Sequence, residues 1–194
     1  MKRLYFIRHG KTQYNEERRY LGTSDLSLST NGRNELVSKW SSGNFGIEFN
    51  CIYSSPMKRC IETSEIIFPD EKPVIINDIK EMDFGIFEGK SYDELALDPV
   101  YKEFIKTRGL SLVPEAEKGV DFASRVQKGF FEILADMNKH SFDNAVIISH
   151  GGVVMALFAA LCKESSDIYY YAINNGECFV TDYHNKELKI IKKL

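Results

Sequence analysis

The sequence predicts an α/β fold, a three-layer α/β/α sandwich with a mostly parallel central sheet and an antiparallel edge. Two apolar runs, Leu4–Ile7 and Ala145–Ile148, end abruptly in polar segments that contain His-Gly. A parallel strand covered on both faces has such a continuous apolar run. Segments with helical periodicity separate the strands, an alternation typical of a sheet with helices on both faces. At 194 residues, the chain is expected to form one domain over 1–194.

The first half of the chain is expected to continue with a long loop, a helix and a second strand. Residues 11–28 show neither a helical nor a strand period, and so long a loop inside a compact domain is usually functional. Ser29 begins a segment with the cap chemistry of a helix, which is expected to run to about Ser41. The second strand is expected over 50–54.

A helix over 56–68 is expected next, because Pro56 is well tolerated at a first helical position. Its first turn would carry Lys58 and Arg59. Cations at that end oppose the helix dipole, so they call for a separate explanation. Two interpretations are open: an anion binds nearby, or both are solvated surface cations.

The second half contains an excursion between sheet elements. A third strand over 73–76 leads into a polar, aromatic stretch of about 83–119, in which Pro99 starts a short helix. We expect this stretch to form a small lid. A helix with an apolar stripe over 120–139 and a C-terminal hairpin over 178–191 complete the pattern.

Composition excludes several classes of protein. The net charge of −3 argues against general nucleic-acid binding, which requires a basic face. The apolar runs are far shorter than a membrane span. Met1-Lys2-Arg3 leads straight into a strand rather than into the apolar part of a signal peptide. We therefore expect a cytoplasmic protein without nucleic-acid or membrane partners.

The cysteines do not form a metal-binding pattern. The four residues, Cys51, Cys60, Cys162 and Cys178, show neither Cys-x-x-Cys pairing nor metal-ligand spacing. Each falls in an expected core element, which indicates buried free thiols.

Charged and imidazole side chains follow the ends of the expected parallel strands. Ligands in such sheets bind just outside the carboxyl ends of the strands. If the tips of the first, second and fourth strands converge, one crevice holds Arg8, His9, Arg59 and His150, with Glu81 arriving from the loop after the third strand. The sequence therefore predicts a cluster of two arginines, two histidines and a carboxyl group.

This set of residue types fits phosphoryl chemistry. Arginine forks bind two phosphoryl oxygens each, and a helix beginning at Gly151 would add free N–H groups. An imidazole such as that of His9 can attack phosphorus in line and form a phosphohistidine. A carboxyl group such as that of Glu81 can protonate the leaving alkoxide and later activate water. Positioning and charge stabilisation supply this chemistry without a metal.

The chain resembles the histidine phosphatase (phosphoglycerate-mutase-like) superfamily over most of its length. Four motifs carry the resemblance, in this order: Arg8-His9-Gly10-Lys11-Thr12 with Asn15; Tyr53-Ser54-Ser55-Pro56 with Arg59 and Thr63; Glu81 with Phe84-Gly85 and Glu88-Gly89; and Ser149-His150-Gly151-Gly152. Any one of them alone would be weak, but four in order are specific.

The resemblance implies a role for each matched residue. His9 would be the nucleophile and Glu81 the proton donor. Phosphoryl oxygens would be bound by Arg8, Arg59 and His150. Substrate-binding candidates are Asn15, Thr12, Gly22 and Gly151.

Two departures from the mutase pattern of the family favour its phosphatase branch. Mutases of the family typically follow their acid/base Glu with Arg-His-Tyr-Gly and carry a larger insertion. Here Glu81 is followed by Met82-Asp83-Phe84-Gly85 and the chain is short, as in phosphatases, particularly those acting on α-ribazole phosphate. Against that substrate, 114–118 reads Pro-Glu-Ala-Glu-Lys where those enzymes usually have Pro-Gly-Gly-Glu-Ser; Glu117 matches. We expect hydrolysis of a small phosphorylated metabolite, with α-ribazole phosphate as one candidate.

Other functions stay open. Phosphoglycerate mutase activity would require a better sealed site than the short excursion suggests. A metal hydrolase could use His9, His150 and Glu81 as ligands, but two arginines would repel the cation. A non-catalytic phospholigand-binding module would be expected to lack the nucleophile or the acid. We expect neither a metal nor another cofactor, and either a monomer or a homodimer.

Aromatic residues gather in the loop and the excursion, where two uses are open. They stack on a ring or sugar of the substrate, or they only pack the lid. The residues concerned are Tyr14, Tyr20, Tyr92, Tyr101 and Phe104.

Overall fold

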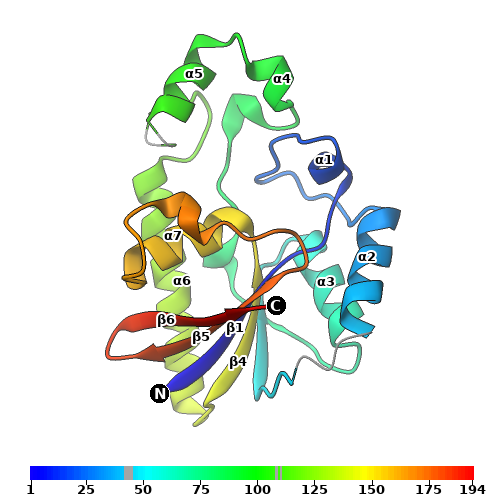
Figure 1. The fold of residues 1–194 in the computed structure, drawn as a ribbon, viewed down its shortest axis with the longest axis vertical. Coiled ribbons are helices and arrows are strands. Elements are labelled where there is room, and N and C mark those ends of the chain that lie inside the picture. Colours follow the sequence, from blue (N-terminus) through cyan, green and yellow to red (C-terminus); the bar gives the residue numbers. More distant parts are fainter. Residues whose placement is uncertain (42–45, 108, 110) are drawn as a thin grey trace.

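In the computed structural model, which describes residues 1–41, 46–107, 109 and 111–194, six strands form one sheet (Figure 1). They are β1 (Lys2–Arg8), β2 (Cys51–Ser54), β3 (Val74–Ile75), β4 (Asn144–Ser149), β5 (Cys178–His184) and β6 (Glu187–Lys193). Their order is β3-β2-β4-β1-β5-β6. The first four pair in parallel, whereas β5 pairs antiparallel with both β1 and β6. The predicted parallel sheet with an antiparallel edge is confirmed.

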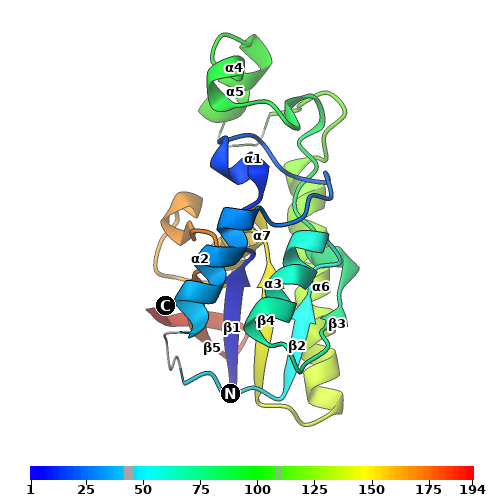
Figure 2. The same ribbon diagram turned by 90° about the vertical axis from the view of Figure 1, so that its right-hand side faces the viewer.

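Helices cover both faces of this sheet. One layer contains α2 (Thr30–Ser41) and α3 (Lys58–Ile67), and the other contains α6 (Gly119–Lys139) and α7 (Gly151–Leu161) (Figure 1, Figure 2). The predicted three-layer α/β/α arrangement is therefore confirmed.

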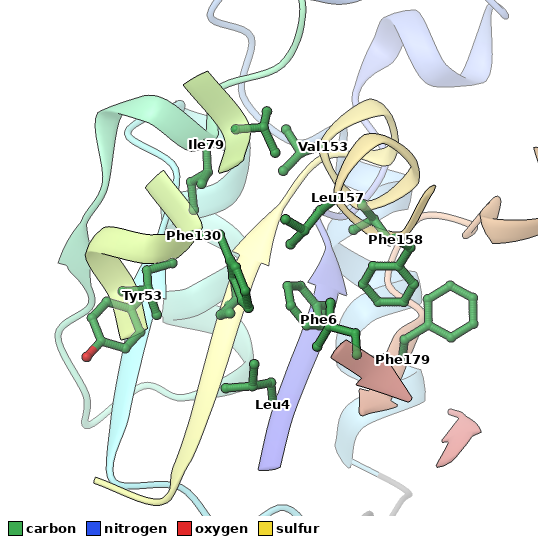
Figure 3. Packing of buried hydrophobic residues seen from close by; sticks show 14 of the residues in the cluster. Leu4, Phe6, Tyr53, Ile79, Phe130, Val153, Leu157, Phe158 and Phe179 are labelled. Atoms are coloured by element: carbon green, nitrogen blue, oxygen red, sulfur yellow. The ribbon is translucent and has the colours of Figure 1, made fainter. Parts of the chain in front are cut away.

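Strand β1 contributes to the hydrophobic cores on both sides of the sheet. Leu4 and Phe6 pack with residues of α6 and α7, and the ring of Phe6 meets that of Phe158 edge-on at a centroid distance of 5.0 Å (Figure 3). Tyr5 and Ile7 point to the opposite face and join the second core. Because successive strand residues alternate between two covered faces, every central position of β1 is apolar.

The register of the parallel strands brings their carboxyl ends level. Arg8 at the end of β1 pairs with Ser149 at the end of β4. Ser54 at the end of β2 pairs with Ile148. The segments that follow these three strands therefore start at the same edge of the sheet, where ligands bind in such folds.

Short helical pieces lie beyond that edge. They are α1 (Gln13–Glu16), η1 (Asn77–Ile79), η2 (Gly85–Phe87), α4 (Tyr92–Leu95), α5 (Pro99–Lys106) and η3 (Ile168–Tyr171). The pieces α4 and α5 stand apart from the sheet, and Figure 1 shows them at the top of the molecule. They enclose a small core of Phe87, Leu95 and Phe104, against which Tyr20 of the 11–28 loop packs.

Local interactions changed some expected boundaries. Helix α3 begins at Lys58 rather than at Pro56, because the chain stays paired with β4 through the Ser55 N–H and Met57 is the N-cap residue. The 11–28 stretch contains α1, whose capping box joins Thr12 and Asn15. Capping boxes satisfy helix-end donors locally, so they allow very short helices.

Three of the cysteines are buried, as expected, but Cys51 is partly exposed at the start of β2. All four thiols are free. Among the described helices, none has the length and apolar character needed to cross a membrane.

Candidate active site

The structure brings the two strand-tip histidines together. The ring centroids of His9 and His150 lie 5.2 Å apart. The Arg59 Nε lies 3.3 Å from the Nδ1 of His150. The Glu81 carboxylate accepts the N–H of Gly152 at the start of α7, over 3.0 Å. The two histidines directly follow β1 and β4, Arg59 lies in α3 and Glu81 in the loop after η1, so the expected convergence takes place.

Hydrogen bonding fixes the proton on the His9 ring. Nδ1 lies 2.7 Å from the carbonyl oxygen of Gly10. A carbonyl only accepts, so Nδ1 carries the hydrogen and Nε2 keeps its lone pair. Burial, followed by the charges of Arg59 and Arg8, lowers the pKa of His9 well below 6.5. The imidazole is therefore neutral and its Nε2 is available as a nucleophile at neutral pH.

His150 and Arg59 form a fully buried pair behind His9. Both side chains have no exposed surface. The guanidinium donates to Nδ1 of His150, so Nε2 carries the ring hydrogen and donates to the Oγ of Ser55 at 2.8 Å. Burial, with the Arg59 charge second, lowers the pKa of His150 well below 6.5. With this neutral ring, Arg59 places a positive charge directly behind the reaction centre.

Backbone carbonyls orient Arg59. Its Nη1 donates to the Ser24 carbonyl at 2.8 Å and its Nη2 to the Gly22 carbonyl at 2.7 Å. The sequence suggested Gly22 as a substrate-binding residue; in the structure its carbonyl holds the arginine. A side chain at position 22 would meet the Met82 carbonyl oxygen at 2.0 Å, so this close approach requires glycine.

Arg8 has an unused donor next to His9. Its Nη1 donates to the Ile173 carbonyl at 2.7 Å, whereas its buried Nε has no hydrogen-bond partner among the described residues. Burial lowers the pKa of Arg8, and the neighbouring Glu81 opposes that shift. A buried N–H without a partner is costly, and a bound oxyanion would satisfy it.

The Glu81 carboxylate lies over the N-terminus of α7. It accepts the backbone N–H of Met82 at 3.0 Å besides that of Gly152. Burial raises the pKa of Glu81 above its ordinary 4.5, although these two N–H groups act in the opposite direction. A carboxyl group with a raised pKa is suited to donate a proton.

Asn15 and Thr12 occupy different positions. The carboxamide oxygen of Asn15 accepts from the Thr12 N–H and Oγ1, and from Asn175 Nδ2. Its NH₂ group is thereby left for the cavity that Asn15 lines. Thr12 is fully buried and caps α1, so the structure places it as support for Asn15.

Asn175 belongs to the site although sequence reasoning missed it. Its Nδ2 donates to the carbonyl of His9 at 3.0 Å. It therefore holds the backbone of the nucleophile candidate from a turn far along the chain. The Asn-Asn-Gly sequence of that turn indicates only a chain reversal, not its neighbour in space.

Arg125 of α6 also belongs to the site and was missed. It donates to the carbonyls of Asp78, Lys80 and Glu81 over 2.7–3.0 Å. It forms a bidentate pair with Glu117 at 2.7 and 2.8 Å. Such a fork fixes the backbone before and at Glu81. In the sequence, Arg125 resembles an ordinary polar residue of an amphipathic helix.

A cavity of about 640 Å³ opens from this cluster. Arg8, His9, Asn15, Glu81 and Gly151 are among its lining residues. The expected crevice is therefore present, but Arg59 and His150 are fully buried and are not among its lining residues.

Comparisons with known proteins agree with this geometry. A model of the histidine phosphatase superfamily (branch 1) matches residues 4–193, so the chain belongs to this superfamily. The chain is 25% identical over 191 residues to a broad-specificity phosphatase of Saccharomyces cerevisiae, covering 93% of this chain and 79% of the relative. It is also 25% identical over 189 residues to the adenosylcobalamin/alpha-ribazole phosphatase of Escherichia coli, covering 95% and 91%.

A solved structure shows the same fold. The crystal structure of a putative alpha-ribazole-5'-P phosphatase from Escherichia coli has a TM-score of 0.82 to this chain, at 23% sequence identity. The match covers 97% of this chain and 94% of the other. The predicted superfamily and its phosphatase relatives are confirmed.

The pKa shifts predict a bell-shaped pH profile for kcat/KM. Attack requires neutral His9, whose pKa is lowered, so the acid limb should fall below pH 6.5. Proton donation requires protonated Glu81, whose pKa is raised, so activity should decline as pH rises through a value above 4.5. The profile should be measured with an alkyl phosphate, after subtracting the substrate's own ionisation. Loss of the alkaline limb in Glu81→Gln would assign that limb, and its persistence there would contradict the assignment.

Proposed function

We propose that this protein is a metal-independent phosphomonoester hydrolase in which the Nε2 of His9 forms a phosphohistidine. The observation that carries the proposal is the orientation of His9. Its Nδ1 hydrogen is committed to the Gly10 carbonyl, so the lone pair of Nε2 is free. The unpartnered Nε of Arg8 and the positive charge of Arg59 stand beside it.

The first half-reaction forms the phosphoenzyme. Nε2 of His9 attacks phosphorus in line, the bond between phosphorus and the ester oxygen breaks, and Glu81 gives its proton to the leaving alkoxide. Charge on the transferring oxygens is stabilised by Arg8 and Arg59, with Asn15 and the N-terminus of α7 as further donors. His150 acts on these oxygens indirectly, because its Nδ1 accepts a hydrogen bond from Arg59 and so helps to hold the guanidinium in place.

The second half-reaction returns the enzyme to its starting state. The Glu81 carboxylate removes a proton from water while the water oxygen attacks phosphorus. The bond from phosphorus to Nε2 breaks, inorganic phosphate leaves, and neutral His9 is restored. The same carboxyl group thus acts as acid and then as base.

Hydrolysis is favoured over mutase activity because the outer cavity is accessible. Two of its lining rings, Tyr92 and Tyr169, are about half exposed, at 52% and 51%. A mutase must retain its intermediate while the phosphoryl group returns, whereas a hydrolase must release product and admit water. The described lining fits the second requirement.

Further properties follow from the same proposal. Residues 1–194 act as one domain, and the described part of the 83–119 excursion covers the site as a lid. The substrate is a small phosphorylated metabolite, and the names of the Escherichia coli relatives make α-ribazole phosphate a candidate. The free thiols favour the cytoplasm, where cysteines stay reduced. A monomer or a homodimer remains the expected state.

Trapping the intermediate tests the proposal. The enzyme is mixed with a ³²P-labelled phosphomonoester, quenched in alkali, where phosphohistidine survives, and mapped by peptide. We expect acid-labile label on His9 and unchanged turnover after dialysis against a chelator. Turnover without any labelled protein, or turnover lost with the chelator and restored by a divalent metal, would contradict a metal-independent phosphohistidine mechanism.

A further inference from the structure

We propose that the cavity next to His9 selects phosphate esters whose alcohol is uncharged and carries a flat aromatic group, and that it rejects esters carrying a carboxylate. This inference rests on the proposed hydrolase function and adds the chemical class of the leaving group. Four properties of the cavity carry it.

The first property is size. Arg8, His9 and Gly151, which would hold the phosphoryl group, are only three of the lining residues, and the total volume of the cavity is about 640 Å³. Cavities of roughly 300–1,000 Å³ hold ligands of drug or nucleoside size. The space beyond His9 therefore fits a leaving group much larger than a three-carbon acid.

The second property is the apolar character of the walls. Tyr20, Tyr92 and Phe104 line one side, from the 11–28 loop and the excursion. Ala156 and Ala159 of α7 line the cavity as well. Such walls favour transfer of a ring out of water, whereas a charge placed against them loses hydration without compensation.

The aromatic wall is also fixed in place. The ring of Tyr20 meets those of Phe84 and Tyr92 nearly edge-on, with centroids 5.0 and 5.3 Å apart. The N–H of Tyr20 donates to the Lys90 carbonyl, which ties the loop to the excursion. A wall that is ordered before the substrate arrives costs less entropy on binding.

The third property is the pairing of the available cations. Among the described residues that line the cavity, the cations are Arg8 and Arg19. Arg8 stands beside the nucleophile. The guanidinium of Arg19 already binds two carboxylates, Glu17 at 2.6 Å and Glu94 at 2.7 Å. A substrate carboxylate would therefore find no unpaired cation among those residues.

The fourth property is a neutral polar group away from the reaction centre. Gln127 of α6 lines the cavity with a neutral carboxamide. It offers both a donor and an acceptor, which suits a hydroxyl or a ring nitrogen. The cavity thus combines an aromatic wall with a neutral hydrogen-bonding group.

Three esters of aliphatic alcohols test the inference, because their leaving groups differ little in basicity. They are 2-(1-naphthyl)ethyl phosphate, propyl phosphate and 3-phosphoglycerate. From the area of a buried ring, we expect kcat/KM for the naphthylethyl ester to exceed that for propyl phosphate by about 100-fold. The value for 3-phosphoglycerate should fall below that for propyl phosphate.

Two neighbouring tyrosines provide a matched pair of variants. Tyr169 lines the cavity, whereas the ring of Tyr170 packs on Tyr171 with centroids 5.2 Å apart. Both are at least half exposed, at 51% and 60%, so neither replacement removes a core residue. Tyr169→Ala should lower the preference for the naphthylethyl ester over propyl phosphate several-fold, and Tyr170→Ala should leave that preference unchanged.

A charge-introducing variant tests the cation argument. Ala159 is an exposed residue of α7 that lines the cavity, and Ala135 is an exposed residue of α6 near its C-terminal half. Ala159→Lys should raise kcat/KM for 3-phosphoglycerate relative to propyl phosphate by about two- to fivefold, the size of an exposed ion pair. Ala135→Lys should not change the ratio.

The outcomes separate this inference from the proposed function. If all three esters are hydrolysed equally well, or 3-phosphoglycerate is preferred, the substrate class is wrong while the hydrolase stands. If none of the three, nor p-nitrophenyl phosphate, is hydrolysed, the hydrolase itself is wrong. If the Tyr169 and Tyr170 variants show the same preference for the naphthylethyl ester over propyl phosphate, the naphthyl ring does not occupy this cavity.

Discussion

Replacing His9 by alanine is expected to lower kcat for every phosphate ester by at least about 10⁴-fold, and to abolish labelling of the protein. The variant lacks the atom that is proposed to accept the phosphoryl group, the Nε2 left free by the bond from Nδ1 to Gly10. Neither Arg8 nor Arg59 can replace a nucleophile. Steady-state kinetics with p-nitrophenyl phosphate and the ³²P trap measure the two effects.

Matched histidine variants distinguish chemistry from folding. His184 is exposed at the end of β5, so His184→Ala should retain full activity. Phosphate should still raise the thermal unfolding midpoint of His9→Ala, because Arg8 and its unpartnered Nε remain. If His9→Ala turns over at a tenth of the original rate while His150→Ala is inactive, the nucleophile is His150.

The fold was predictable because its signals are local. Successive residues of β1 alternate between two covered faces of the sheet, so all four residues from Leu4 to Ile7 are apolar. His9 and His150 directly follow neighbouring parallel strands, so the sequence could place both at the same edge of the sheet. Pro99 marked the start of α5, where Asp98 caps the first turn.

Parts of the site were not predictable because they depend on contacts between distant segments. The Asn175 amide reaches the His9 carbonyl across 166 positions of sequence. Arg125 holds the Glu81 carbonyl from 44 positions away. The sequence named Tyr20 as a candidate for stacking, but its position is fixed by rings of the excursion, which the sequence does not relate to it. No spacing rule relates such pairs.

Replacing Glu81 by glutamine is expected to slow phosphorylation of His9 according to the leaving group. Alkyl esters need a proton on the departing oxygen, so their rate should fall about 10²–10⁴-fold. p-Nitrophenolate leaves without one, so its release should change little in a single turnover. The second half-reaction also loses its base, so phosphoenzyme should accumulate and give a burst of p-nitrophenol.

Rapid-quench kinetics over a series of alcohols measures this dependence. Glu132→Gln, at an exposed position of α6, is the matched control and should behave as the unmodified enzyme. An equal loss for alkyl and nitrophenyl esters in the phosphorylation step would exclude Glu81 as the acid. It would leave the carboxyl group a role in holding the loop only.

The Gly152→Ala variant tests whether the position of the Glu81 carboxyl group matters separately from its ability to carry a proton. A Cβ at position 152 would lie 2.4 Å from Glu81 Oε1, so the carboxyl group must move while keeping its ability to carry a proton. A displacement of about 1 Å costs on the order of 10²-fold in rate. The thermal unfolding midpoint should not fall, because alanine is a better helix former than glycine.

In the double variant with Glu81→Gln, the two losses of rate should not add, since both act through one carboxyl group. Full additivity would mean that Gly152 serves the phosphoryl group directly, through the N–H that now binds Glu81.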